Sequence, residues 1–166
     1  MSKVRYLILI FSILILGIFL SSCSEEKKMA LPDGLPEYVL EDDFNMIDWE
    51  RKAVNFDDML GNQNIVGVIG ANMPSLNGQK WMWHLWGIDE VISNELTVVG
   101  YHKETQTVHP ILMNANNDWT ITLGGKNNGA DAHVPSAVKF TDKGDWALLL
   151  YVDDQLFDIL VVNINE

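Results

Sequence analysis

The sequence predicts an all-β protein built as a two-sheet β-sandwich. From residue 64 onward, short runs rich in β-branched and aromatic residues alternate with turn-forming Asn, Asp and Gly. Seven or eight such runs follow one another at near-regular spacing, and no long helical period interrupts them. The 166 residues are the length expected for one domain together with a targeting segment.

Residues 1–22 predict the signal peptide of a secreted lipoprotein. Lys3 and Arg5 precede an unbroken apolar run from Leu7 to Leu20. As a helix, that run would reach about 21 Å, which is short of the roughly 30 Å hydrocarbon core of a bilayer. A basic flank and a short apolar core are typical of a cleaved signal peptide. An uncleaved membrane anchor is the alternative.

The end of this run resembles the lipobox of bacterial lipoproteins. It reads Leu20-Ser21-Ser22-Cys23, an aliphatic residue and two small residues ahead of the sole cysteine in the sequence. The resemblance implies diacylglyceryl transfer to the Cys23 sulfur and cleavage before that residue. Two acyl chains such as palmitate, at about 0.8 kcal/mol per buried CH₂, make a stable anchor. We therefore expect acylated Cys23 to insert among membrane lipids and hold the protein at the outer face of the bacterial cytoplasmic membrane.

The segment after the cysteine divides into a tether and a domain. Residues 23–36 are polar at first and then broken by two prolines and a glycine, which predicts a lipidated N-terminus and a flexible tether. The sandwich is expected to occupy residues 37–166. In its first part, residues 38–60, acidic clusters mix with scattered apolar residues, and neither a helical nor a strand period prevails.

The later part of the domain predicts eight candidate strands in order. They are Ile65–Ile69, Gln79–Trp86, Leu96–His102, Val108–Met113, Trp119–Leu123, Ala137–Phe140, Trp146–Val152 and Phe157–Ile164. The last two flank Asp153-Asp154, which predicts a hairpin turn.

Charge limits the possible partners. Cleavage before Cys23 removes two of the 11 basic residues and none of the 23 acidic ones, so the mature chain carries 9 − 23 = −14. Phosphates would repel such a module, and we expect no nucleic-acid partner. The acidity fits either solubility beside an anionic surface or attraction of cations and basic partners.

Three stretches carry a further signal. They are Gln79–Gly87, Gly129–Ser136 and a closing run from Gly144 to Phe157. Together they resemble a family of Gram-positive lipoprotein domains of unknown function, over about residues 61–164. The resemblance implies an immunoglobulin-like sandwich and an extracytoplasmic location. It implies no activity and no functional residues.

The Trp-rich strand offers the first candidate binding residues. One face of it is expected to be core, because tryptophan on a sandwich strand usually packs between the sheets. That face holds Trp81, Trp83 and Leu85. The opposite face holds Met82, His84 and Trp86. It is either covered as well or an exposed aromatic platform able to stack on sugar rings or peptide.

A loop adds two further candidates. Asp131 and His133 lie in the predicted loop Gly125–Ser136, and loops carry function more often than strands do. With Trp86 and His84 they form the predicted ligand-binding set. The structural alternative is that Asp131 caps a turn.

Metal binding and catalysis find little support. No His-x-His or His-x-x-x-His pair occurs, the nearest histidines being His102 and His109, and the EF-hand calcium spacing is absent. Nucleophile-elbow, P-loop, dinucleotide-binding and HExxH motifs are also absent. We therefore expect no metal, no cofactor and no catalytic residue. The predicted function is a non-enzymatic binding or interaction module with a cell-wall or protein partner. The alternatives are a carbohydrate- or cell-wall-binding module and a cation-binding lipoprotein.

Overall fold

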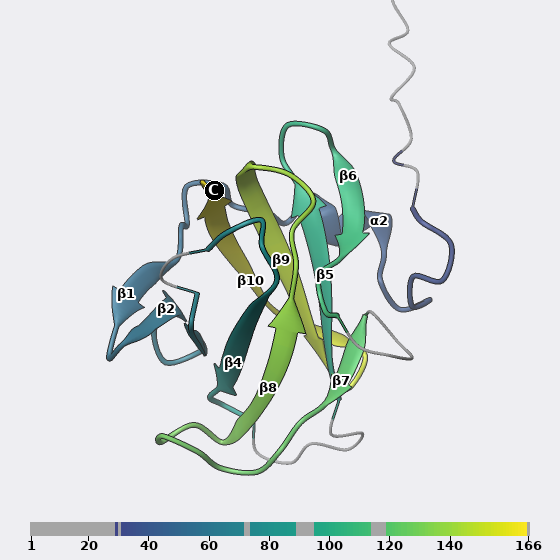
Figure 1. The fold of residues 1–166 in the computed structure, drawn as a ribbon. Coiled ribbons are helices and arrows are strands. Elements are labelled where there is room, and N and C mark those ends of the chain that lie inside the picture. Colours follow the sequence, from purple (N-terminus) through teal and green to yellow (C-terminus); the bar gives the residue numbers. More distant parts are fainter. Residues whose placement is uncertain (1–28, 30, 72–73, 89–94, 114–118, 166) are drawn as a thin grey trace, which may run out of the picture.

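The chain folds into two antiparallel sheets that face one another, which confirms the predicted β-sandwich (Figure 1). The computed structural model describes residues 29, 31–71, 74–88, 95–113 and 119–165. The predicted signal peptide and Cys23 lie outside this part of the chain. Within it, no helix has the length and apolarity needed to cross a membrane. The immunoglobulin-like assignment of the sandwich stays a prediction.

One sheet has the strand order β1-β2-β3-β4-β8, and we call it the β4 sheet. Its strands are β1 (Val54–Phe56), β2 (Met59–Asn62), β3 (Val66–Ile69), β4 (Gln79–Leu85) and β8 (Ala132–Val138). The other, the β9 sheet, has the order β10-β9-β5-β6, and β7 also pairs with β5. Its strands are β5 (Glu95–His102), β6 (Thr107–Pro110), β7 (Thr120–Thr122), β9 (Gly144–Val152) and β10 (Gln155–Ile164).

The main core lies between the sheets and is rich in tryptophan. Trp81 and Trp83 of β4 and Trp146 of β9 are at most 1% exposed. Trp81 and Trp83 meet edge to face, with ring centroids 5.4 Å apart. Trp81, Trp83 and Leu85 therefore form the buried face of β4, as predicted. The Trp83 indole N–H donates a 2.8 Å hydrogen bond to Ser136 Oγ of β8, so this buried polar group is satisfied.

A second apolar cluster covers the outer face of the β9 sheet. It accounts for the scattered apolar residues of segment 38–60, several of which belong to this cluster. Short helix α2 (Glu41–Phe44) places Phe44 against Tyr101, with ring centroids 5.2 Å apart. The Tyr151 hydroxyl donates a 2.8 Å hydrogen bond to Asp43. Burial and this carboxylate raise the pKa of Tyr151 above its ordinary range. The N-terminal segment therefore forms a layer over the β9 sheet before the chain crosses to β1 and β2.

Part of the predicted tether also lies on this layer. Met29, Leu31 and Leu35 are partly buried and pack against the second cluster. The domain boundary at residue 36 stays a prediction, but the contacts of Leu31 and Leu35 show that the chain reaches the domain surface earlier than that.

The closing hairpin matches its prediction. Val152 pairs with Gln155, and Asp153 and Asp154 between them both have positive φ, 51° and 64°. Two consecutive left-handed residues fit the two-residue turn whose twist matches that of the strands. A register shift between Leu156 and Asp158 then bends β10.

The predicted strand Ala137–Phe140 is wrong in its position, because β8 begins at Ala132. Pro135 favours a loop in the sequence, yet it lies inside the strand, opposite Met82 of β4. β8 is the last strand of its sheet, where proline is tolerated because no neighbouring strand needs its N–H. The strand predicted as Val108–Met113 is likewise shorter and ends at Pro110.

The outermost strands are covered or short. Along the outer edge of β8, the Gly124 N–H donates to the His133 carbonyl (2.7 Å) and the Met113 N–H donates to the Ala137 carbonyl (2.9 Å). Beside β10, the Ala53 N–H donates to the Val161 carbonyl at 2.8 Å. The remaining edge strands, β1, β6 and β7, have three, four and three residues.

Candidate functional site

The outer face of the β4 sheet collects most of the predicted binding residues. Because Trp81 and Trp83 point into the core, the residues that alternate with them point outward. Strand register then aligns them in rows: Lys80 beside Ala137, Met82 between Ile69 and Pro135, and His84 between Gly67 and His133. We call this surface the β4–β8 face. Its members are Ile69, Lys80, Met82, His84, Trp86, His133, Pro135, Ala137 and Lys139.

His84 is the centre of this surface and is fully buried, at 0% exposure. Its ring stacks beside Trp86 on one side (6.2 Å between centroids, 28° between planes) and His133 on the other (6.3 Å, 26°). Phe56 extends the aromatic row, with its ring centroid 6.3 Å from that of Trp86. Of the two alternatives predicted for this face, the covered one is therefore confirmed at His84. Trp86 and His133 are only half-buried and remain accessible.

Glycine at position 67 makes this packing possible. A Cβ there would lie 2.8 Å from the Phe56 ring and 2.8 Å from the Met59 sulfur. The β1–β2 hairpin thus packs closely over β3 and closes one side of the His84 environment. Nothing in the alternation of the sequence indicates this covering.

The polar atoms around His84 are unevenly satisfied. Its Nε2 lies 3.4 Å from Asn127 Oδ1 and 3.2 Å from Asn128 Nδ2. Its Nδ1 is buried without a hydrogen-bond partner among the described residues. His133 differs, because its Nδ1 donates to the Gly125 carbonyl at 2.6 Å. A neutral His133 ring then keeps its acceptor at Nε2.

Asp131 has a positioning role. Its carboxylate accepts a 2.9 Å hydrogen bond from the Gly87 N–H, and its own N–H donates to the Leu85 carbonyl at 2.9 Å. Gly87 has a φ of +81°, which favours glycine. Asp131 thus fixes the chain just after β4, where Trp86 begins to project. The structure brings His84, Trp86 and His133 into one row and places Asp131 at its end.

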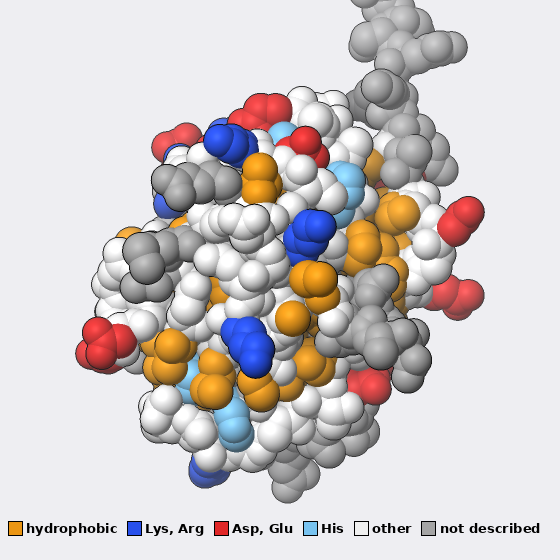
Figure 2. Space-filling view, viewed as in Figure 1, with side chains coloured by type: hydrophobic (Ala, Val, Ile, Leu, Met, Phe, Trp, Pro, Cys, Tyr) orange, Lys and Arg blue, Asp and Glu red, His pale blue; other side chains and the backbone are white. Residues whose placement is uncertain are grey.

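The charge of the β4–β8 face is opposite to that of the chain. Strands β3, β4 and β8 contribute no Asp or Glu, although the whole chain has a net charge of −12. Lys80 and Lys139 are exposed on the face, and Lys126 is exposed in the adjoining loop. Figure 2 shows hydrophobic and basic side chains over this region, with the acidic ones mainly towards the rim. In the sequence, the hydrogen-bonded Asp131 directly precedes β8, Asp142 follows Lys139 by three residues, and Asp89 and Glu90 follow Trp86 by three and four residues.

The lysines are functional candidates that the sequence reasoning missed. Lys80 is one position before Trp81, and Lys139 follows β8 by one residue. The two share a face only because Gln79 pairs with Val138, so Lys139 continues the outward row of β8. With β8 predicted to start at Ala137, that register was hidden.

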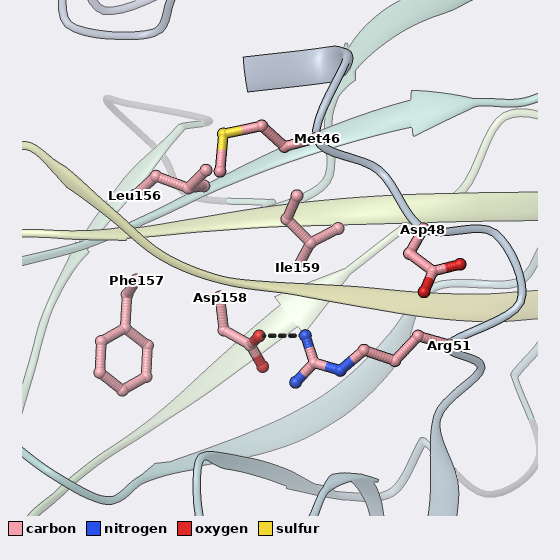
Figure 3. Close-up of a pocket in the computed structure, with 7 residues that line it drawn as sticks. All are labelled: Met46, Asp48, Arg51, Leu156, Phe157, Asp158 and Ile159. Atoms are coloured by element: carbon pink, nitrogen blue, oxygen red, sulfur yellow. Dashed lines mark hydrogen bonds and ion pairs between the residues drawn. The ribbon is translucent and has the colours of Figure 1, made fainter.

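A concave site lies beside β10, away from the β4–β8 face, with a volume of about 210 Å³ (Figure 3). Its lining residues are Met46, Asp48, Arg51, Leu156, Phe157, Asp158 and Ile159. Arg51 Nη1 contacts Asp158 Oδ1 at 2.8 Å, and Asn62 Nδ2 donates to the other carboxylate oxygen at 2.7 Å. The Arg51 charge is therefore already paired, and the pocket joins the N-terminal layer to β2 and β10 as a structural contact.

The other two histidines are joined through threonine hydroxyls. His102 Nδ1 lies 2.8 Å from Thr105 Oγ1, which lies 2.6 Å from Thr107 Oγ1, which lies 2.7 Å from His109 Nε2. Burial lowers the pKa of His109, and nearby His102 lowers it further against an opposing effect of Asp142. Among the described residues, no group of three or more His, Cys, Asp or Glu is arranged to hold a metal ion.

Comparison with known proteins supplies a family and a fold. Residues 38–162 match a family model described as "Domain of unknown function (DUF4871)". The crystal structure of a protein described as a "Putative Lipoprotein from Bacillus anthracis" is similar, with a TM-score of 0.62. Sequence identity is 15%, over 78% of this chain and 96% of that one, so the likeness concerns the fold. No curated protein matches the chain.

Proposed function

We propose, from the premise that this chain belongs to the family of the domain of unknown function DUF4871, that it is a lipid-anchored, non-enzymatic binding module. Acylated Cys23 would hold it at the outer face of the bacterial cytoplasmic membrane, and the β4–β8 face would receive a cell-wall or protein partner. The lipobox supports the anchor. A structural neighbour described as a lipoprotein is consistent with it.

The observation that carries the binding proposal is the row formed by Trp86, His84 and His133. These three rings lie side by side on one sheet face. The angle between neighbouring ring planes is under 30°. Trp86 and His133 expose part of flat, amphipathic rings, which suits stacking combined with hydrogen bonding. His84 and Asp131 hold those two residues in place from beneath and beside.

The binding test compares two variants with matched controls. Trp86→Ala and His133→Ala remove the accessible rings, while Trp49→Ala and His109→Ala remove partly buried rings of the same types on the β9 sheet side. Full-length lipidated protein in detergent is incubated with isolated cell wall and with secreted proteins, and the bound fraction is measured. We expect at least about fivefold weaker binding for the first pair only. Unchanged binding in both, with near-UV circular dichroism intact, would refute the site.

The anchor has its own test. Cys23→Ser should release the protein from membranes into the medium or leave the signal peptide attached. Mass spectrometry of the wild-type protein should show an N-terminal diacylglyceryl cysteine. An intact Met1 on wild-type protein would refute lipid anchoring without bearing on the binding face.

A further inference from the structure

We propose that the β4–β8 face recognises an anionic glycopolymer, a chain of sugars or polyols that carries phosphate or carboxylate groups. This inference rests on the proposed binding function and names the chemistry of its partner. It follows from three features of the face: its local charge, its flat apolar centre and its position on the sandwich.

The local charge favours a polyanion. Lys80 and Lys139 lie on adjacent strands, offset by two positions in register, where side chains are about 7–8 Å apart. Lys126 adds a third exposed charge beside His133, through the loop in which Gly124 pairs with that residue. Within a chain of net charge −12, a face to which strands β3, β4 and β8 bring no carboxylate is a local reversal of sign. Such a surface concentrates anions, while the acidic remainder disfavours unspecific contact.

The spacing favours an extended chain over a single small anion. Lys139 and His133 are six residues apart in nearly extended backbone, which is about 20 Å along β8. Between them lies the uncharged row of Ile69, Met82 and Pro135. A polymer with anionic groups at intervals would place them at the lysines and rest its ring or chain carbons on this row. The Asn127 and Asn128 amides and the half-buried Trp86 ring lie at the other end, where hydroxyl groups and a sugar face fit.

The position of the face argues against the lipid surface itself. Met29, Leu31 and Leu35 approach the domain over the β9 sheet, which is the opposite layer of the sandwich. The β4–β8 face is therefore on the opposite layer of the sandwich from the one that these residues contact. That orientation suits a partner beyond the membrane.

The test uses dextran sulfate as the polyanion, neutral dextran as its uncharged counterpart and phosphatidylglycerol vesicles as the lipid surface. Lys139→Glu reverses a charge on the face, and Lys143→Glu makes the same net change next to β9 in the other sheet. With full-length lipidated protein in detergent, we expect dextran sulfate to bind. Raising the salt from 50 to 200 mM should weaken that binding at least about fivefold. Lys139→Glu should weaken it at least fivefold and Lys143→Glu less than twofold. Protein without detergent, reconstituted in neutral vesicles, should give the same ranking.

Four results would overturn the proposal. Equal effects of Lys139→Glu and Lys143→Glu would show that net charge alone acts. Tighter binding to phosphatidylglycerol vesicles than to dextran sulfate would assign the face to the membrane. If the wild-type protein does not bind dextran sulfate but Trp86→Ala still loses cell-wall binding, the polyanion proposal is refuted and the proposed binding function is supported. Unchanged cell-wall binding in both Trp86→Ala and Lys139→Glu would refute both the polyanion proposal and the proposed binding function.

Discussion

The contact between Arg51 and Asp158 allows a quantitative test of how the N-terminal layer is held on the sandwich. The two residues are 107 positions apart and meet at 2.8 Å, with Asn62 donating to the second carboxylate oxygen (Figure 3). We consider Arg51→Met, which keeps much of the apolar stem, Asp158→Asn, which keeps the shape, and the double variant.

The size of the effect follows from the exposure of the two side chains. The Asp158 side chain is 5% exposed and that of Arg51 is 45% exposed. Separating a fully buried pair costs about 3–5 kcal/mol, and an exposed pair contributes about 0–1 kcal/mol. A pair buried at one end should therefore show a coupling free energy of about 1.5–2.5 kcal/mol. Asn62 still donates to the carboxylate when Arg51 is replaced, which keeps the value below the fully buried limit.

Urea unfolding followed by tryptophan fluorescence gives the free energies of unfolding for the double-mutant cycle. Each single variant should lose about 2 kcal/mol, and the double variant should lose little more than either. At this chain length the midpoint temperature of each single variant should fall by about 4–8 °C. An unchanged m-value serves as the control for comparable unfolding. A coupling free energy below about 0.5 kcal/mol would show that the contact does not hold the layer in place.

Three further perturbations have defined outcomes. Ser136→Ala should leave the buried Trp83 indole N–H without an acceptor and lower the free energy of unfolding by about 1–3 kcal/mol in urea titrations; a loss below 0.5 kcal/mol contradicts it. The Asn163 side chain is the main cause of the lowered pKa of Asp145, so Asn163→Ala should raise that pKa in NMR titrations. Because a depressed carboxyl pKa stabilises the fold above the unfolded pKa near 4, the stability difference should be complete at neutral pH and vanish as pH falls through the folded value. Gly100→Ala should make a methyl group overlap with the buried Ile111 side chain and lower the free energy of unfolding by about 1–3 kcal/mol. Unaltered thermal unfolding would contradict that close packing.

Sequence patterns predicted most of the sandwich because strand formation here is local. The Trp-rich strand and the final hairpin alternate with period two, and a two-residue Asp-Asp turn sets the hairpin register by itself. Position within a sheet is not local. Pro135 would interrupt the sheet only if another strand lay on the side that its missing N–H would face. That side is open because β8 is outermost, which no short stretch of sequence states.

The candidate site was predicted in part for the same reason. Trp86, His84 and His133 could be named from two stretches, but their stacking depends on the pairing of His84 with His133 across β4 and β8. The burial of His84 depends on Phe56 and Gly67, from a region with no clear period. The lysines were not predicted as binding residues. The net charge of the whole sequence is strongly negative, and it does not reveal a local group of basic residues on one face of the fold.

The edge arrangement of this sandwich matters most if many copies share a membrane. Lipid anchoring would confine them to a plane, where lateral encounters are frequent and every neighbour is upright. Adding one molecule's sheet to the next would require a long, free row of amide groups. In the described part of the chain the two longer outer strands already have hydrogen-bonding neighbours, and the other three have only three or four residues. Dense surface display is thereby compatible with individual, non-fibrillar molecules.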